Sequence, residues 1–483
     1  MIPMRRFPIP FVLVCLGAAL ALAQSRGGNW PTSGGDAQRS GWEGVDARIS
    51  KDTVKDLQLL FKVKLESQSK GSRPLLPPII MGRLISYRGF RELAFVGSNS
   101  DIVYAIDADL GTIFWQKHLE YSTREPQVTT STPDCPGGMT ATPTMSVPGV
   151  AGPRGAAAAA PARGGAPAAS FIAGTASVYA ISSDGRLHRL NVSTGDDIVQ
   201  PVQVLPANSK TSNLMMVNNI IYTVTSPACN LTRNAVWAID LSVDPPKAMS
   251  FALNAGEVAG SAGPVIGTDG TVYVQTSGRL LSLSAGDLAM KGYFTSTDLS
   301  PDASPLVFQY NNREMIVSTS KDGRIFLLDA ATFSGNHESV TYQTMPLAIS
   351  GSLSTWQDAE AIRWVLAPVW ARNGTSPNGQ IAALKLEEQA GKTVLSPAWV
   401  SRDMNSPLPP VIASGVVFAL SAGKGATRAT LYALDAATGK ELYSSRNLVA
   451  APASLAGMTV ANGRVYFSTL DSTMYAFGMF MEH

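Results

Sequence analysis

The sequence predicts an all-β fold: an eight-bladed β-propeller of four-stranded antiparallel blades, closed by an N-terminal strand that completes the last blade. Three observations support this prediction. A short strand motif recurs eight times, most copies are separated by the length of one blade, and the last copy has no room for a fourth strand behind it.

The recurring motif is a short apolar strand followed by an Asp or Asn and a glycine turn. Its clearest copies are Val103–Ala108, with Gly111 behind it, and Leu431–Gly439. The second positions of the eight copies are Tyr104, His188, Trp237, Leu281, Phe326, Ala382, Tyr432 and Tyr475. All but the first interval lie between 43 and 56 residues, which suits one four-stranded blade of about 40–50 residues.

The first interval is 84 residues long and contains two segments of biased composition. Residues 152–169 form an Ala/Pro/Gly-rich insertion, which we expect to be disordered because it holds too few large apolar side chains to offset the entropy of ordering. Residues 121–138 are rich in Thr, Ser and Pro. Without these two segments the interval contains one ordinary blade.

Each copy reads as one strand of a blade. Its alternating residues point to opposite faces, where apolar side chains pack on neighbouring blades. The terminal Asp or Asn is expected to bond the backbone of the turn, and the glycine supplies a left-handed conformation. These aspartates are therefore predicted to be structural.

The chain ends too soon to supply the fourth strand of the last blade. Only Met479–His483 follow the eighth copy, whereas the early segment Leu57–Leu65 is a strand without partners before it. We expect this segment to complete the last blade, so that no open sheet edge is left.

The N-terminus has the order of a secretory signal peptide: Arg5 and Arg6, an apolar run, and small residues up to Ala23. Cleavage is predicted after about Ala23, which implies a periplasmic or secreted protein without a transmembrane segment. The predicted organisation is a signal peptide over 1–23, a lead-in over 24–56 and the propeller over 57–483.

Charge and cysteine content limit the partners. Removal of residues 1–23 leaves 36 basic and 36 acidic side chains, a balance that predicts no nucleic-acid binding. Cys135 and Cys229 could form a disulfide in an oxidising compartment, and two unpaired buried thiols are the alternative. The four histidines show no metal-ligand spacing, so neither a zinc site nor a Ser-His-Asp site is expected.

Two stretches carry a family resemblance. Tyr432–Lys440 reads Tyr-Ala-Leu-Asp-Ala-Ala-Thr-Gly-Lys, and Asn29–Gly41 begins Asn-Trp-Pro-Thr. Both resemble the pyrroloquinoline-quinone (PQQ) repeat propeller family, which includes quinoprotein dehydrogenases and non-catalytic propellers. In the dehydrogenases the quinone stacks between a tryptophan and a disulfide of adjacent cysteines, calcium polarises it, and an aspartate acts as base. This chain has no adjacent cysteine pair.

The resemblance implies site candidates only in part. Asp403 and Asn405 precede an inner strand, where loops reach the channel mouth; in a quinoprotein Asp403 would be the catalytic base and Asn405 a calcium ligand. The alternative is an ordinary turn between blades. A stacking face could come from Trp356, Trp364, Trp370 or Trp399, although tryptophans on outer strands more often dock one blade on the next.

Two functions follow. The first is an exported binding or scaffold module of the bacterial cell envelope, in contact with an envelope protein or ligand. The alternative is a PQQ- and calcium-dependent dehydrogenase of alcohols or sugars that passes electrons to a separate cytochrome. A carboxylate cluster in the central channel would favour the dehydrogenase.

Overall fold

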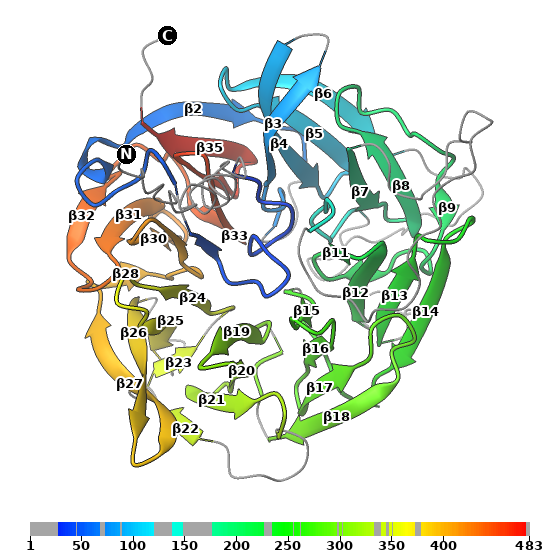
Figure 1. Ribbon diagram of the computed structural model, residues 1–483. Helices are drawn as coiled ribbons and strands as arrows, with labels where there is room; N and C mark the ends of the chain where they lie inside the picture. The colour runs from blue at the N-terminus through cyan, green and yellow to red at the C-terminus, as the bar shows by residue number, and fades with distance from the viewer. Residues whose placement is uncertain are drawn as a thin grey trace, which may run out of the picture.

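The computed structural model describes residues 28–44, 46–67, 73–86, 89–119, 138–147, 176–226, 234–254, 256–260, 262–296, 299–301, 303–332, 340–343, 347–349, 351–371 and 378–479. The strands form eight small sheets around a central axis (Figure 1). Each sheet contains one of the eight motif copies, in the strand next to its outermost strand. The predicted eight-bladed propeller is therefore confirmed.

Blades 1 to 4 follow one another along the chain. Blade 1 consists of β3 (Ile79–Ser86), β4 (Gly89–Ser98), β5 (Ile102–Asp107) and β6 (Thr112–His118). Blade 2 consists of β7 (Ser177–Ile181), β8 (Arg186–Asn191) and β9 (Val202–Gln203), with Thr144 bridged to Tyr179 on the inner side. Blade 3 consists of β10 (Lys210–Thr211), β11 (Met215–Val217), β12 (Ile220–Ser226), β13 (Ala235–Asp240) and β14 (Lys247–Ala252). Blade 4 consists of β15 (Val265–Ile266), β16 (Val272–Gln275), β17 (Arg279–Leu283) and β18 (Met290–Thr295).

Blades 5 to 8 complete the ring. Blade 5 consists of β19 (Leu306–Tyr310), β20 (Arg313–Thr319), β21 (Arg324–Asp329) and β22 (Val340–Gln343). Blade 6 consists of β23 (Leu347–Ile349), β24 (Ser354–Gln357), β25 (Arg363–Ala371), β26 (Asn378–Gln389), β27 (Lys392–Val400) and β28 (Met404–Asn405). Blade 7 consists of β29 (Val411–Ala413), β30 (Val416–Ser421), β31 (Thr430–Asp435) and β32 (Glu441–Ser444), with β1 (Trp42–Glu43) parallel to β29. Blade 8 consists of β33 (Ala453–Ala461), β34 (Arg464–Thr469), β35 (Thr473–Gly478) and β2 (Gln58–Lys64), which follows the 3-10 helix η1 (Val54–Asp56).

The N-terminal strand closes the ring as predicted. β2 pairs antiparallel with β35 from Gln58↔Gly478 to Lys64↔Thr473, and in Figure 1 the two strands lie side by side although they are at opposite ends of the chain. The last blade thus obtains its fourth strand, and its outer edge is covered.

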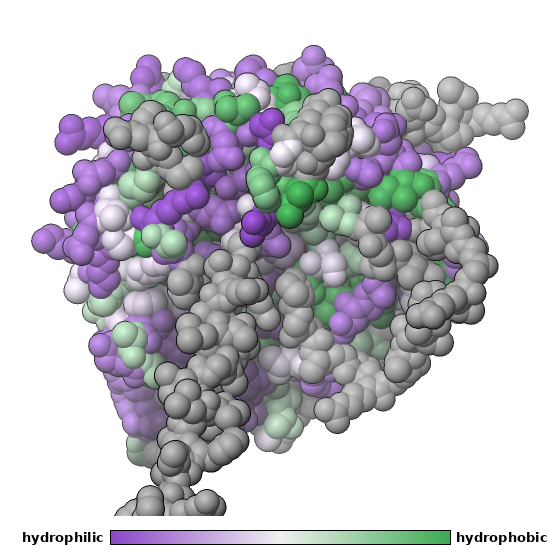
Figure 2. Space-filling view, turned by 45° about the horizontal axis from the view of Figure 1, so that its top comes forward, coloured by the Kyte–Doolittle hydropathy of each residue, from purple (hydrophilic) through white to green (hydrophobic). Residues whose placement is uncertain are grey.

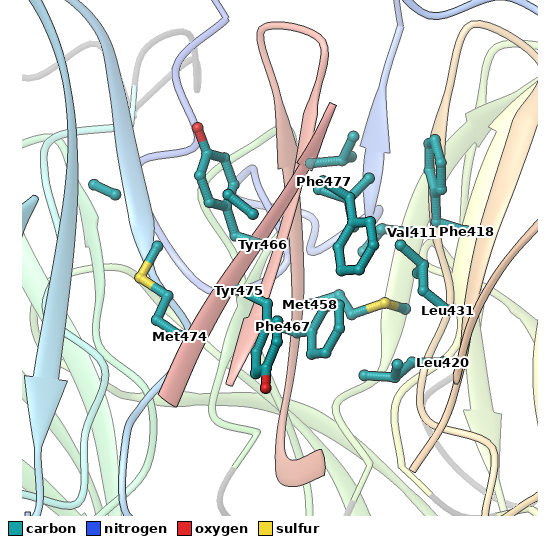
Figure 3. Packing of buried hydrophobic residues seen from close by; sticks show 14 of the residues in the cluster. Val411, Phe418, Leu420, Leu431, Met458, Tyr466, Phe467, Met474, Tyr475 and Phe477 are labelled. Carbon is teal, nitrogen blue, oxygen red and sulfur yellow. The ribbon is translucent and has the colours of Figure 1, made fainter. Parts of the chain in front are cut away.

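Alternation along the strands gives each sheet two buried faces. In blade 8, Phe467 and Phe477 point toward Phe418 and Leu431 of blade 7, whereas Tyr466 points the opposite way (Figure 3). Phe467 and Phe477 stack with their ring centroids 5.8 Å apart. Apolar residues therefore fill the space between blades, and the core is a series of wedges between neighbouring sheets.

The glycine turns serve as docking points for aromatic side chains of the preceding blade. Trp115 on β6 lies against Gly195 and donates from Nε1 to the Val192 carbonyl at 2.9 Å. Trp399 on β27 repeats this contact with Gly439 and with the Ala436 carbonyl at 3.0 Å. The expected docking of outer-strand tryptophan between blades is thus found at Trp399.

The turn aspartates are structural, as predicted. In the last full copy, Asp435 Oδ1 accepts hydrogen bonds from the backbone amides of Ala437 and Thr438, and Gly439 has a φ of 72°. Asp107 receives the corresponding amides of Asp109 and Leu110. The carboxylates of Asp435 and Asp107 thus stabilise the turns that follow their strands.

Among the described residues, no helix is both long and apolar enough to span a membrane. The predicted signal peptide, the insertion at 152–169 and the pair Cys135 and Cys229 lie outside the described residues.

The docking contact can be tested by adding one methyl group. A Cβ on Gly439 would come within 2.5 Å of the Trp399 ring, whereas a Cβ on Gly391, at a similar φ of 76°, meets nothing within 4 Å. We expect Gly439→Ala to lower the free energy of unfolding by about 2–5 kcal/mol, from left-handed strain plus overpacking, and Gly391→Ala by about 1–2 kcal/mol from strain alone. Urea unfolding measures both, and equal losses would rule out a stabilising Trp399 contact.

Candidate functional site

A cavity of about 350 Å³ lies on the inner side of the blades. Its wall comes from the N-terminal segment, the loops ahead of several inner strands, the middle of β33 and the end of β25. The polar side chains of the wall belong to Ser33, Arg39, Arg73, Asn213, Ser304, Ser352 and Ser354. The apolar side chains of the wall include those of Trp370, Leu353, Leu408, Pro409 and Met458. A wall of apolar groups with a few polar ones is typical of a small-molecule site.

Residues 30–43, which we call the channel segment, run through the middle of the ring and form part of this wall (Figure 1). The segment is held by hydrogen bonds to inner strands or the loops beside them in six blades: Trp30 with Ile80, Pro31 with Met145, Thr32 with Leu214, Ala37 with Ile266, Ser40 with Thr355 and Gly41 with Ile412. Because these partners converge only when the ring is closed, the channel segment obtains its position from the whole propeller.

Arg39 is the central cation of the channel segment. Its side chain is 4% exposed and donates to three carbonyls: Nε to Pro264 at 2.9 Å, Nη1 to Ser33 at 2.6 Å and Nη2 to Asn213 at 3.2 Å. Burial lowers the pKa of Arg39 to about 9, partly offset by the charge of Asp36. In the described part of the chain, no ion pair within 4.0 Å includes this guanidinium.

A second feature of the channel segment is acidic. Glu43 is half-buried, and burial together with the charges of Asp46 and Asp36 raises its pKa to about 7. Asp36 itself bonds Ser40 through both carboxylate oxygens. Asp46 accepts from the backbone amides of the turn that follows it. The carboxylates of Asp36 and Asp46 are thus used in hydrogen bonds, and their negative charges make ionisation of Glu43 less favourable.

The two residues predicted from sequence do not line the cavity. Asp403 is exposed, and its Oδ1 accepts a hydrogen bond from Gln380 Nε2 at 2.9 Å. Asn405 belongs to β28, and its Oδ1 is buried without a hydrogen-bond partner among the described residues. The roles of Asp403 as a base and Asn405 as a calcium ligand stay predictions.

Of the four candidate tryptophans, Trp370 alone lines the cavity. Its Nε1 donates to the Pro407 carbonyl at 3.0 Å, which fixes the indole ring. Trp356 and Trp364 stack on each other with centroids 5.7 Å apart inside a hydrophobic cluster. Trp370 is therefore the candidate for contact with a flat ligand.

The donor set of the cavity does not fit calcium. Calcium takes six to eight oxygen ligands, mostly carboxylates and carbonyls, yet none of the described lining residues is Asp or Glu. The Asn213 amide oxygen already accepts two hydrogen bonds from Thr142. No described group of three or more His, Cys, Asp or Glu is placed to hold a metal ion.

Blade 2 contains a constellation that the spacing of the histidines did not suggest. His188 Nδ1 lies 2.9 Å from Asp197 Oδ1, and His188 Nε2 lies 3.2 Å from Ser182 Oγ. The Ser182 hydroxyl, however, donates to Asp184, and the side chain is 3% exposed. Since the same hydroxyl-to-aspartate bond recurs in the corresponding turn of another blade, from Ser320 to Asp322, Ser182 is a turn residue and no activated nucleophile.

Sequence reasoning missed Arg39 and Asn213. Arg39 falls in the stretch that resembles a family N-terminus, but nothing in its neighbours indicates a contact with residues 213 and 264. The contact arises from closure of the ring, so a pattern in the sequence could not reveal it.

Comparison with known families and structures agrees with the fold. A family model described as the outer membrane protein assembly factor BamB matches residues 377–478. No curated protein matches the chain. The match covers strands β26 to β35.

The solved structures that share the fold include three dehydrogenases. They are the quinohemoprotein alcohol dehydrogenase of Comamonas testosteroni (16% identity, TM-score 0.60, 97% of this chain and 83% of that chain), the quinohemoprotein alcohol dehydrogenase ADHIIG of Pseudomonas putida HK5 (12%, 0.59, 96% and 82%) and a europium-containing methanol dehydrogenase (11%, 0.61, 95% and 100%). At these identities the likeness concerns the fold alone.

The raised pKa of Glu43 predicts a pH-dependent stability. The folded protein holds the Glu43 proton more tightly than the unfolded chain, so stability falls as pH rises from about 5 to 7 and the loss is complete above 7. We expect Glu43→Gln to remove this loss and to gain about 1–2 kcal/mol at pH 8, after a discount for solvent screening. Thermal unfolding from pH 4.5 to 8 measures it, with the exposed Glu360→Gln as the control. Parallel curves for wild type and Glu43→Gln would contradict the assignment.

Proposed function

We propose that this chain is an exported binding module of the bacterial cell envelope. The proposal starts from its likeness to β-propellers of the PQQ-repeat family. The observation that carries the proposal is the cavity wall. It presents Arg39, Arg73, hydroxyl groups and apolar side chains, which suit the recognition of a ligand and do not supply the oxygen cage of a calcium-assisted oxidation.

The surface supports the cavity as the site. The large apolar side chains that are exposed in the described residues are distributed over blades 1, 3, 4, 6, 7 and 8, from Ile85 to Leu470. In the view of Figure 2 hydrophilic side chains cover most of the coloured surface, and hydrophobic ones form small separate groups. A concave site with convergent polar groups is the better candidate for specific binding.

The cell-envelope location rests on the N-terminal sequence pattern and is tested by export. Expression of the full chain in a bacterium should place it outside the cytoplasm, with a mature N-terminus near Gln24. Cell fractionation and mass spectrometry of the intact protein measure both. Retention of the full-length chain in the cytoplasm would overturn this part of the proposal.

The binding role predicts how the mature protein responds to pyrroloquinoline quinone. We expect no calcium-dependent change in tryptophan fluorescence or melting temperature on titration with the quinone, and no dye-linked oxidation of primary alcohols or sugars. The reason is that the described cavity wall offers no carboxylate to calcium. Saturable, calcium-dependent binding with a raised melting temperature, followed by dye reduction, would establish the dehydrogenase instead.

A further inference from the structure

The wall of the central cavity contains a positive charge that carbonyl dipoles solvate and that no described carboxylate contacts within 4.0 Å. The charge of Asp36 acts on it from a greater distance. Arg39 is 4% exposed, and among the described residues its side chain bonds the carbonyls of Pro264, Ser33 and Asn213. A guanidinium has five N–H donors, and three of them are used by these bonds. Burying a charge is costly unless a counter-charge accompanies it. The cavity next to Arg39 is where such a counter-charge can enter.

Other groups of the wall suit the remainder of a ligand. Ser352 Oγ accepts a hydrogen bond from the Ser304 amide at 3.2 Å, and its own proton has no acceptor among the described residues. Trp370 is fixed by its bond to Pro407 and offers a flat apolar ring. A volume of about 350 Å³ is at the lower end of the range for small-molecule pockets.

We propose that the central cavity binds a small organic carboxylate, with its anionic group hydrogen-bonded directly to Arg39 and its flat apolar body against Trp370. The planar guanidinium matches the geometry of a carboxylate, and the arginine supplies the charge that a metal ion would otherwise provide. This inference rests on the proposed binding function and names the class of ligand for the same site.

The first test compares acids with their neutral amides. Mature wild-type protein is titrated with 1-naphthoate and indole-3-acetate, and with 1-naphthamide and indole-3-acetamide, by calorimetry in the presence of EDTA. We expect each acid to bind at one site without calcium, and each amide to bind at least about tenfold more weakly, because a hydrogen bond from Arg39 to a neutral amide is weaker than one to a carboxylate. If neither acid binds more tightly than its amide, the proposal is wrong.

The second test changes the charge. Arg39→Gln should weaken binding of the acids at least about tenfold and leave binding of the amides unchanged. The matched control is Arg363→Gln: Arg363 is also buried, lies over the rings of Trp42 and Phe308 and does not line the cavity. This variant should bind the acids as wild type does. Equal weakening by both variants would assign Arg39 a purely structural role.

A third variant and a pH series cover the case in which Arg39→Gln does not fold. Ser352→Ala leaves the bonds of Arg39 intact and should weaken acid binding severalfold, while Ser396→Ala on the outer strand β27 should not. Acid binding by the wild type should be constant from pH 6.5 to 8 and weaken above about pH 9, as Arg39 loses its proton. Binding that is unaffected by Ser352→Ala and by pH would overturn the inference.

Failure of the proposed function is distinguishable from failure of this inference. Calcium-dependent quinone binding with dye reduction would overturn the binding-module proposal, whatever affinity the protein has for the amides. Binding of acids and amides with equal affinity removes the carboxylate inference and leaves a binding module of other specificity.

Discussion

Closure of the ring is the constraint on which the rest of this structure depends. Each blade has two apolar faces, and each face is buried only when the adjacent blade packs against it. The ring is therefore reinforced where it closes: β2 pairs with β35 inside blade 8, and Arg464 of β34 forms an ion pair with Glu92 of β4 in blade 1 at 2.6 Å. Both of these side chains are buried, and the Tyr466 hydroxyl bonds the same carboxylate. The two ends of the chain are thus locked together in the blade that closes the ring.

The channel segment depends on this closure. Its backbone and side chains bond inner strands that lie up to several hundred residues away in the sequence, from Ile80 in blade 1 to Ile412 in blade 7. These partners form a surface around it only when every blade is in place. In return, the segment satisfies backbone groups at the inner edges of the blades, where an unpaired carbonyl or amide would be costly. Arg39 enters the cavity wall as part of the same arrangement.

A shared fold does not imply a shared functional site. The solved structures with this fold include quinohemoprotein alcohol dehydrogenases, whereas the described cavity wall here combines arginine, serine and apolar groups. The blades supply a scaffold whose loops and inner strands converge on the axis, and the side chains placed there decide the chemistry. In the proposed site, Arg39 binds a carboxylate directly in the central cavity, and no calcium ion takes part.

The sequence by itself determined the number of blades, the order of their strands and the closing strand, because these features follow from local alternation, turn chemistry and the spacing of repeats. It also placed the structural aspartates, such as Asp435, correctly in turns. The cavity was decided only by tertiary structure. Asp403 precedes an inner strand and is predicted as a site residue for that reason, yet it is exposed beside Gln380, whereas Arg39, Asn213 and Trp370 line the same cavity. Repeats specify how neighbouring strands pair, but which side chains face one another across the ring depends on the position of all eight blades at once.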